Sequence, residues 1–352
     1  MKKIVLLCSV LLLVLSGCGS SVDNSKNTTG CETLKVFNWG VYIDDETKDK
    51  FEDQYGVKVI YDEYTSNEEM YTKLLGGEVY DILYPSDYMV QRLIAENALQ
   101  AIDKTALSNY NNLLDDVIGW EFDPENTYSI PYFWGSVGIL YNKNNVSETE
   151  LKNEGFNILR NSKYQGEIYM YDSERDSFMV ALKALGYSMN TSDTAELNEA
   201  YQWLIDQKKE VNPILGTDDI IDNMVAGLKD LAIMYSGDAT YIMSENPVLG
   251  YYVPDTGSNV WLDSMVIPAE SKCVDLANLW IDFQLSEKIA TANSEWVGYS
   301  SSVQSVYEEI ASDYYADYDS YTTEINANDE VFQYNAEVKE IISDLWTRVK
   351  AS

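Results

Sequence analysis

Residues 259–268 read Asn-Val-Trp-Leu-Asp-Ser-Met-Val-Ile-Pro, an alternation of apolar with polar or aromatic residues that is typical of a half-buried β-strand. The alternation places Trp261 and Asp263 side by side on one face of that strand. An indole face beside a carboxylate suits an organic cation, because the ring offers a negative quadrupole and the acid a charge-assisted hydrogen bond. The structural alternative is a core tryptophan followed by a turn aspartate. Taken alone, Trp261 and Asp263 favour this alternative, because strand tryptophans mostly lie in the core.

The composition limits the partners and the chemistry. The chain has 352 residues, which predicts about two domains, and 24 Lys+Arg against 58 Asp+Glu give it a net charge of -34. That charge repels nucleic acid and anionic membrane surfaces, although solubility alone also explains it. The chain has no histidine, which excludes Ser-His-Asp and Cys-His catalysis and imidazole metal ligands. We expect no metal, no cofactor and no nucleic acid partner.

The N-terminus has the features of an export signal. Lys2 and Lys3 precede an apolar run over residues 4–15 that is too short for a stable membrane anchor. The run ends in Leu-Ser-Gly-Cys at residues 15–18, which resembles the bacterial lipobox. This resemblance implies cleavage after residue 17, lipidation of Cys18 and a flexible linker over residues 18–32. We therefore expect the protein on the outer face of the cytoplasmic membrane, held there by its lipid.

Cys31 and Cys273 are the thiols of the part of the chain that is expected to fold. Outside the cell they have the redox conditions to form a disulfide. Two buried free thiols fit the sequence equally well, because nothing in it brings the two residues together.

Strands and helices alternate along the chain. Residues 34–38, 44–55 and 57–61 predict a strand, a helix ended by Gly56 and a parallel strand, the first unit of an α/β sheet. Later strands are expected at 79–84, 131–142, 167–171, 211–214, 231–235, 250–253 and 259–268. Later helices are expected at 67–75, 87–96, 174–185, 194–208, 218–227, 274–285, 287–293 and 331–350.

Two long extended segments divide these units into two lobes. Residues 131–142, whose glycines let a strand bend, lead from the first set of units to the second, and residues 259–268 lead back. We expect lobe 1 to hold residues 33–136 and about 264–303, and lobe 2 to hold about 137–263 and 304–352. Two lobes joined by two strands form a cleft that can close on a ligand.

Several short motifs occur in a fixed order along the chain. They are Phe37-Asn38-Trp39 with Tyr42, Ser66 to Tyr71, Tyr80-Asp81-Ile82 with Pro85 to Tyr88, Tyr128 to Tyr132, Leu185 to Ser188, and Trp261 to Ser264. Together they resemble the spermidine/putrescine-binding proteins of bacterial polyamine ABC importers, over essentially the whole chain from residue 34. The resemblance implies a two-lobed periplasmic-binding-protein-like fold of type II and a monomeric, non-catalytic receptor that delivers its ligand to ABC permease subunits.

The resemblance also implies a binding site for a linear polyamine, with rings along its methylenes and carboxylates at its ammonium ends. Its ring residues are Trp39, Tyr42, Tyr235, Trp261 and Tyr299, its polar contacts are Ser86, Tyr88 and Gln333, the last on the final helix, and its acids are Asp176 and Asp263.

Three positions bear on the length of the amine. Spermidine-preferring relatives carry acids at the positions of Gly40 and Ser173, whereas Asp238 resembles an acid of putrescine-preferring relatives. A shorter dication needs its carboxylates closer together, so the position of the acids should decide the preferred length. From the sequence, putrescine and spermidine are equally expected as ligands.

Two alternatives stay open. One is a binding protein of the same fold for another organic cation. The other is a secreted glycosidase with paired carboxylates, which the abundance of acids and aromatic rings permits.

Overall fold

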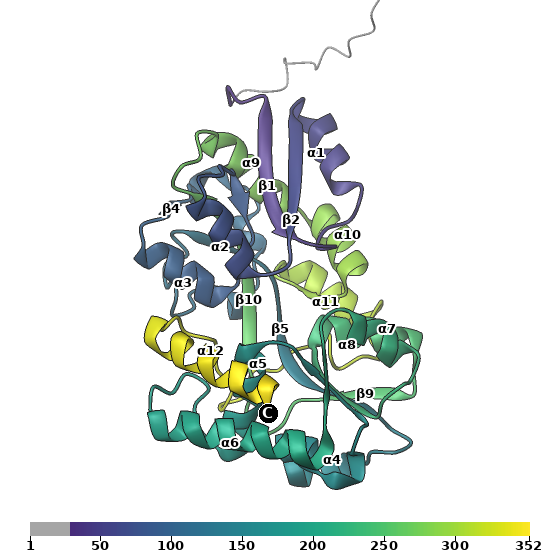
Figure 1. Cartoon of the computed structure of the whole chain (residues 1–352). Helices are drawn as coiled ribbons and strands as arrows, with labels where there is room; N and C mark the ends of the chain where they lie inside the picture. Colours follow the sequence, from purple (N-terminus) through teal and green to yellow (C-terminus); the bar gives the residue numbers. More distant parts are fainter. Residues whose placement is uncertain (1–28) are drawn as a thin grey trace, which may run out of the picture.

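The structure is a computed structural model that describes residues 29–352. It shows two α/β lobes, one above the other in Figure 1, connected by long strands. This arrangement confirms the expected two-lobed fold. The predicted signal peptide and Cys18 lie outside the described residues.

The strands are β1 (Thr33–Trp39), β2 (Lys58–Tyr64), β3 (Ile82–Leu83), β4 (Leu99–Gln100), β5 (Ser129–Asn142), β6 (Ile168–Tyr171), β7 (Ile214–Gly216), β8 (Leu231–Tyr235), β9 (Leu249–Tyr252), β10 (Val260–Pro268) and β11 (Ser300–Ser301). Their order is β2-β1-β3-β10-β5-β8-β6-β7, with β4 paired to β10 and with β9 and β11 paired to β5. The sheet of lobe 1 thus continues into that of lobe 2 through β5.

The helices are α1 (Thr47–Tyr55), α2 (Asn67–Leu75), α3 (Asp87–Ala95), α4 (Glu148–Glu154), α5 (Glu174–Leu185), α6 (Thr194–Val211), α7 (Asp219–Val225), α8 (Ser236–Glu245), α9 (Val274–Gln284), α10 (Glu287–Val297), α11 (Gln304–Ser312) and α12 (Ala336–Ala351). Short 3-10 helices lie at Lys104–Ala106, Tyr110–Asn112, Asp115–Val117, Gly155–Arg160 and Ser162–Tyr164. From residue 29 onward, the chain forms no helix both long and apolar enough to cross a membrane.

The first strand, helix and strand have the predicted arrangement. Strands β1 and β2 pair in parallel, and α1 crosses between them. Helix α1 ends at Gly56, whose φ of 65° is the left-handed conformation that glycine adopts without strain. The backbone N–H of Gly56 donates to the carbonyl of Glu52, so the helix end is hydrogen-bonded.

Strands β5 and β10 are antiparallel neighbours that connect the lobes, as predicted. The expectation that β10 is half-buried is wrong, because every residue of the strand is buried. The glycines of β5 make room for rings: a Cβ on Gly135 would lie 2.8 Å from the Trp261 ring, and one on Gly138 would lie 2.6 Å from Tyr251. Both glycines therefore allow close packing across the connecting strands.

Three predicted elements differ from the structure. The strand expected at 79–84 shrinks to β3, because the side chain of Asp81 accepts the N–H of Lys35 in place of a strand carbonyl. Val211 belongs to α6, so the following strand starts only at Ile214. The last helix starts at Ala336, where the Asn335 side chain accepts two backbone N–H groups and caps it. Helices α4 and α11 were not predicted.

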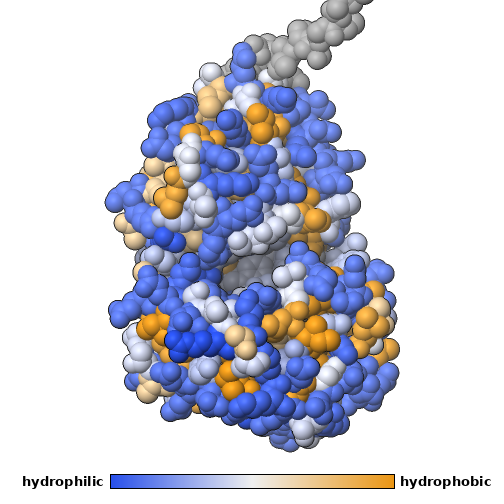
Figure 2. All heavy atoms as spheres, in the orientation of Figure 1, coloured by the Kyte–Doolittle hydropathy of each residue, from blue (hydrophilic) through white to orange (hydrophobic). Residues whose placement is uncertain are grey.

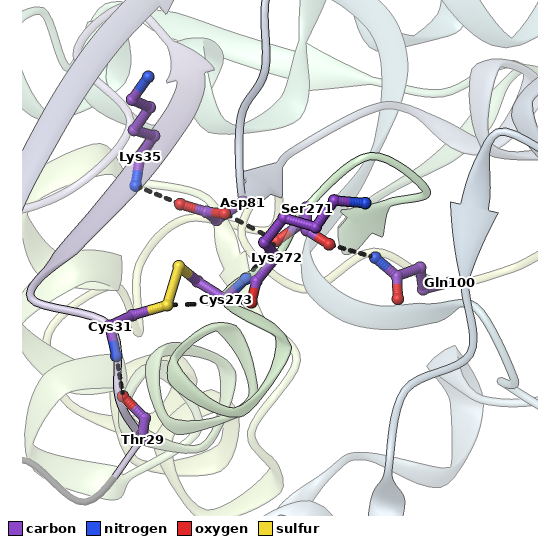
Figure 3. Close-up of a disulfide and its surroundings, with 8 residues drawn as sticks. All are labelled: Thr29, Cys31, Lys35, Asp81, Gln100, Ser271, Lys272 and Cys273. Atoms are coloured by element: carbon purple, nitrogen blue, oxygen red, sulfur yellow. Dashed lines mark hydrogen bonds between the residues drawn. A yellow bond between two sulfur atoms is a disulfide. The ribbon is translucent and has the colours of Figure 1, made fainter.

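Cys31 and Cys273 form a disulfide, which decides between the two possibilities that the sequence left open. Their Cα atoms lie 5.8 Å apart, and the bond ties the start of β1 to the N-terminus of α9. Figure 3 shows Ser271 beside it, donating its hydroxyl to Asp81 and accepting the N–H of Cys273. The disulfide thus closes a covalent loop that begins and ends in lobe 1.

The expected lobe boundaries stay a prediction. Helix α12 packs on α5 and α6 in lobe 2, whereas α11 packs against α10 and β11 at the junction of the lobes (Figure 1).

Candidate ligand-binding site

The surface is hollowed where the two lobes meet, as Figure 2 shows. Strands β5 and β10 run between the lobes at this level (Figure 1). Candidate residues from lobe 1 end β1 or cap α3, and those from lobe 2 end β8 or lie in the first turns of α5 and α8. The fold therefore brings strand ends from both lobes toward one region.

Asp263 lies at the centre of this region. The register between β10 and β5 shifts between Asp263 and Ser264, a bulge of the kind that re-aims side chains near functional sites. The Tyr42 hydroxyl donates to Oδ2 of Asp263 at 2.7 Å. The other carboxylate oxygen, Oδ1, is buried and lies within hydrogen-bonding geometry of no group among residues 29–352. Burial raises the pKa of the Asp263 carboxyl, and the neighbouring Ser86 hydroxyl lowers it in part. A buried carboxylate oxygen without a donor is costly, so this atom has capacity for a ligand donor.

Two further acids come from lobe 2, and each accepts hydrogen bonds from tyrosines. The Tyr235 hydroxyl donates to Asp176 at 3.0 Å. Asp238 accepts from Tyr299 at 2.9 Å and from Tyr171 at 3.3 Å. All three acids thus stand at the polar ends of aromatic rings, as an ammonium site requires.

The rings form a connected wall. Tyr171 stacks on Tyr235 with centroids 4.8 Å apart, and Tyr235 meets the edge of Trp261 at 6.2 Å. Trp261 contacts Tyr299 at 5.1 Å, and Tyr299 contacts Tyr42 at 5.7 Å. The wall runs from lobe 2 to lobe 1; Trp261 is part of it, and Asp263 is joined to it through the Tyr42 hydroxyl. Their side-by-side placement is therefore confirmed.

Gly237 allows this wall to close. A Cβ on Gly237 would lie 1.9 Å from the Tyr299 ring, an impossible contact. The glycine is the second residue after β8 and lies in the first turn of α8, so the ring packs against helix backbone. Tyr299 can then reach Asp238, one residue further along the helix.

Burial raises the pKa of all three carboxyls. Desolvation brings the pKa of Asp263 and that of Asp238 to about 6, despite the hydrogen bonds that they accept, and it also raises the pKa of Asp176. Within the described chain, no lysine or arginine forms an ion pair with any of the three; Arg175, next to Asp176, pairs with Glu68 instead. These carboxylates would be stabilised by a cation that comes from outside the chain.

The raised pKa values predict a pH dependence of cation binding. Below pH 6 the Asp238 and Asp263 carboxyls hold protons, which an ammonium ligand must displace. Affinity is therefore full above the raised pKa and is lost as the pH falls through it, by roughly tenfold between pH 7.5 and 5.5. Calorimetry across this range checks the expectation. An affinity that rises toward acid pH would contradict it.

The remaining predicted residues of lobe 1 lie on its side of the cleft. The Trp39 indole N–H donates to the carbonyl of Tyr84 at 2.8 Å. Asn67 donates to both the Ser86 and the Tyr88 hydroxyl, at 3.1 and 2.9 Å. Asn67 thus fixes two predicted ligand contacts in one orientation.

Gln333 is not among the buried residues of this region. It precedes α12, so its expected place on the last helix is wrong. Its side chain is exposed and its amide donates to Glu121 at 3.2 Å. A role in ligand binding stays a prediction for this residue.

Sequence reasoning missed two residues. Tyr171 ends β6 and bonds Asp238, and its position at a strand end is the same signal that singled out Trp39. Asp87 is buried, and its carboxylate accepts the N–H of Leu262, joining α3 to β10. Desolvation raises the pKa of Asp87 to about 7. The sequence showed Asp87 as a helix start and as part of the Pro85 to Tyr88 motif, without a role in the site.

Known proteins share this architecture. The sequence profile of the bacterial extracellular solute-binding proteins matches residues 46–323. The spermidine/putrescine-binding periplasmic protein of Escherichia coli (strain K12) is 34% identical over 272 residues, 76% of each chain. The putrescine/cadaverine-binding protein of Pseudomonas aeruginosa is 28% identical over 309 residues, covering 85% of this chain and 84% of its own.

A solved structure agrees with them. The spermidine/putrescine ABC transporter substrate-binding protein PotD of Streptococcus pneumoniae is 32% identical, has a TM-score of 0.79, and covers 91% of this chain and 99% of its own. The resemblance found in the sequence is thereby confirmed. The chain belongs to the bacterial extracellular solute-binding proteins and, within them, to the family of the spermidine/putrescine-binding proteins of ABC importers.

Proposed function

We propose that this protein captures a linear polyamine between its lobes and delivers it to an ABC permease. The observation that carries the proposal is the free, buried Oδ1 of Asp263, set among rings with two further acids that form no ion pair with a lysine or arginine of the described chain. Membership of an extracellular solute-binding family implies export of the protein.

The chemistry of a polyamine matches each part of the site. An ammonium group that leaves water needs charge-assisted hydrogen bonds, which carboxylates provide. Ring faces add about 0.5 to 2 kcal/mol for each close cation contact and also cover the methylenes. A ligand charged at both ends would find acids on both sides of the cleft. Asp176 and Asp238 lie on one side, and Asp263 lies with Tyr42 on the other.

Calorimetric titration of residues 29–352, which keep the Cys31–Cys273 disulfide, with putrescine, cadaverine, spermidine and spermine tests the proposal. We expect one-to-one binding of at least one amine. The matched control is 1,4-butanediol, which has the length of putrescine but no charge and should not bind. A folded sample that is free of co-purified ligand and binds none of the four amines would overturn the proposal.

Asp238 is proposed to set the preferred length of the amine. The Ser173 hydroxyl accepts the N–H of Asp176 and caps α5, so this position supplies no second acid. Asp238 supplies a carboxylate from α8 instead. Moving an acid between these positions changes the distance between the sites for the two ammonium groups.

The variant Asp238→Ser should therefore lose more affinity for putrescine than for spermidine. A change of about tenfold in the ratio of the two dissociation constants corresponds to one charge-assisted hydrogen bond. Asp218→Ser removes a nearby exposed acid and serves as the control for long-range charge. Equal losses for both amines would contradict this role of Asp238.

We also propose that Cys18 carries the lipid that holds the protein at the cell surface, with the chain between Cys18 and the disulfide-bonded Cys31 as its tether. The lipobox-like sequence before Cys18 supports this proposal. Full-length Cys18→Ser expressed in bacteria should appear in the medium rather than in the membrane fraction. Unchanged membrane association would contradict the anchor.

A further inference from the structure

Arg175 connects the two lobes beside the candidate site. It lies in the first turn of α5, in lobe 2, and its guanidinium carbon is 3.5 Å from the centroid of the Tyr88 ring on α3, in lobe 1. An Nη atom of Arg175 also lies 3.6 Å from the carboxylate of Glu68 on α2. One side chain thus makes a cation–π contact and an ion pair across the cleft.

The surroundings hold this contact in place. The Tyr88 ring is 8% exposed, and its hydroxyl accepts a hydrogen bond from Asn67. Glu68 is also 3.9 Å from Lys339 on α12, so one acid of lobe 1 faces two cations of lobe 2. A planar guanidinium on a mostly buried ring is a stronger arrangement than an exposed ion pair.

The position of Arg175 in the chain relates this contact to the ligand. It directly precedes Asp176, whose carboxylate is held by Tyr235 in the candidate site. It stacks on Tyr88, which is itself a predicted ligand contact. The same helical turn therefore carries a proposed ligand acid and the residue that reaches the opposite lobe.

We infer that Arg175 is a positioning residue that clamps lobe 2 onto Tyr88 and Glu68 of lobe 1 and so retains the polyamine in the closed cleft. This inference rests on the proposed function. Contacts that form only when the lobes meet stabilise the closed complex. They do not stabilise the open state, in which the ligand first binds. Their loss should therefore accelerate dissociation and leave association nearly unchanged.

The test measures association and dissociation of the bound amine by stopped-flow tryptophan fluorescence. Arg175→Met, which keeps an unbranched apolar stem, should raise the dissociation rate about tenfold and change the association rate less than about twofold. Arg175→Lys keeps the charge but loses the planar stacking, so its dissociation rate should lie between those of the wild type and Arg175→Met. Glu68→Gln should give a smaller, salt-sensitive increase.

Arg160→Met is the matched control, because Arg160 stacks on Trp203 and pairs with Glu210 entirely within lobe 2. It should change neither rate. Unchanged dissociation in Arg175→Met, or a loss of affinity that comes only from slower association, would overturn the clamp.

Small-angle scattering without ligand separates this inference from the proposed function. Arg175→Met should have a larger radius of gyration than the wild type at equal thermal stability, whereas Arg160→Met should not. If the wild type bound no polyamine but showed this difference, the contact of Arg175 between the lobes would stand, whereas the proposed function and the retention of a polyamine would both fall. Equal radii together with equal dissociation rates would overturn the clamp alone.

Discussion

Asp263→Asn is expected to weaken polyamine binding by about a hundredfold while the protein stays folded. The asparagine keeps the shape of the side chain but removes the negative charge that an ammonium group would meet at the unpaired Oδ1. Removing one partner of a buried, hydrogen-bonded charge pair costs about 2 to 5 kcal/mol, and 2.7 kcal/mol is about a hundredfold in affinity. The Tyr42 hydroxyl keeps an acceptor, since the amide oxygen can take the place of Oδ2.

Calorimetric titration checks the affinity, and thermal unfolding followed by circular dichroism checks the fold. In the ligand-free protein the unfolding temperature should not fall, because burial of the carboxylate is itself unfavourable. The control is Asp317→Asn, which removes the same charge from an exposed position. A dissociation constant within error of the wild type would remove Asp263 from the site.

Replacing both Cys31 and Cys273 by serine is expected to lower the free energy of unfolding by roughly 4 to 5 kcal/mol. The disulfide joins residues 242 positions apart, so it restricts a large part of the unfolded chain. It joins the start of β1 to the N-terminus of α9, whereas the three acids of the site lie on β10, α5 and α8. Polyamine affinity should therefore change little where the variant is folded.

Guanidinium unfolding of the oxidised wild type, the reduced wild type and the double variant measures this effect. The reduced wild type and the double variant should unfold at a similar, lower midpoint. Equal midpoints for the oxidised wild type and the double variant would show that the disulfide contributes nothing to stability.

The fold could be predicted largely from local patterns. The β1-α1-β2 unit follows from a short apolar run, an amphipathic helix and Gly56, all of them local signals. The errors came where side chains replaced backbone partners. Asp81 shortens β3 by bonding the backbone of Lys35, and Asn335 starts α12 five residues late. The contact of Asp81 depends on a segment 46 positions away, whereas the cap at Asn335 is a local signal that the expected helix start overlooked.

The types of residue in the site were also predictable, but their pairing was not. The sequence indicates acids and rings at strand ends, whereas Tyr42 donates to Asp263 across 221 positions and Tyr299 to Asp238 across 61. The contribution of Gly237 depends on the Tyr299 ring beside it, which only the three-dimensional arrangement reveals. Arg175 directly precedes Asp176 in the sequence, and its role appears only because the Tyr88 ring of the other lobe lies beside its guanidinium.

A crystal structure of the protein with putrescine tests the central claim most directly, because it locates the ammonium groups. We predict one amine nitrogen within about 3 Å of Oδ1 of Asp263 and the other beside an acid of lobe 2, with the methylenes against Trp261 and Tyr299. Putrescine bound outside the interlobe region, or bound there without contact to Asp263, would contradict the account.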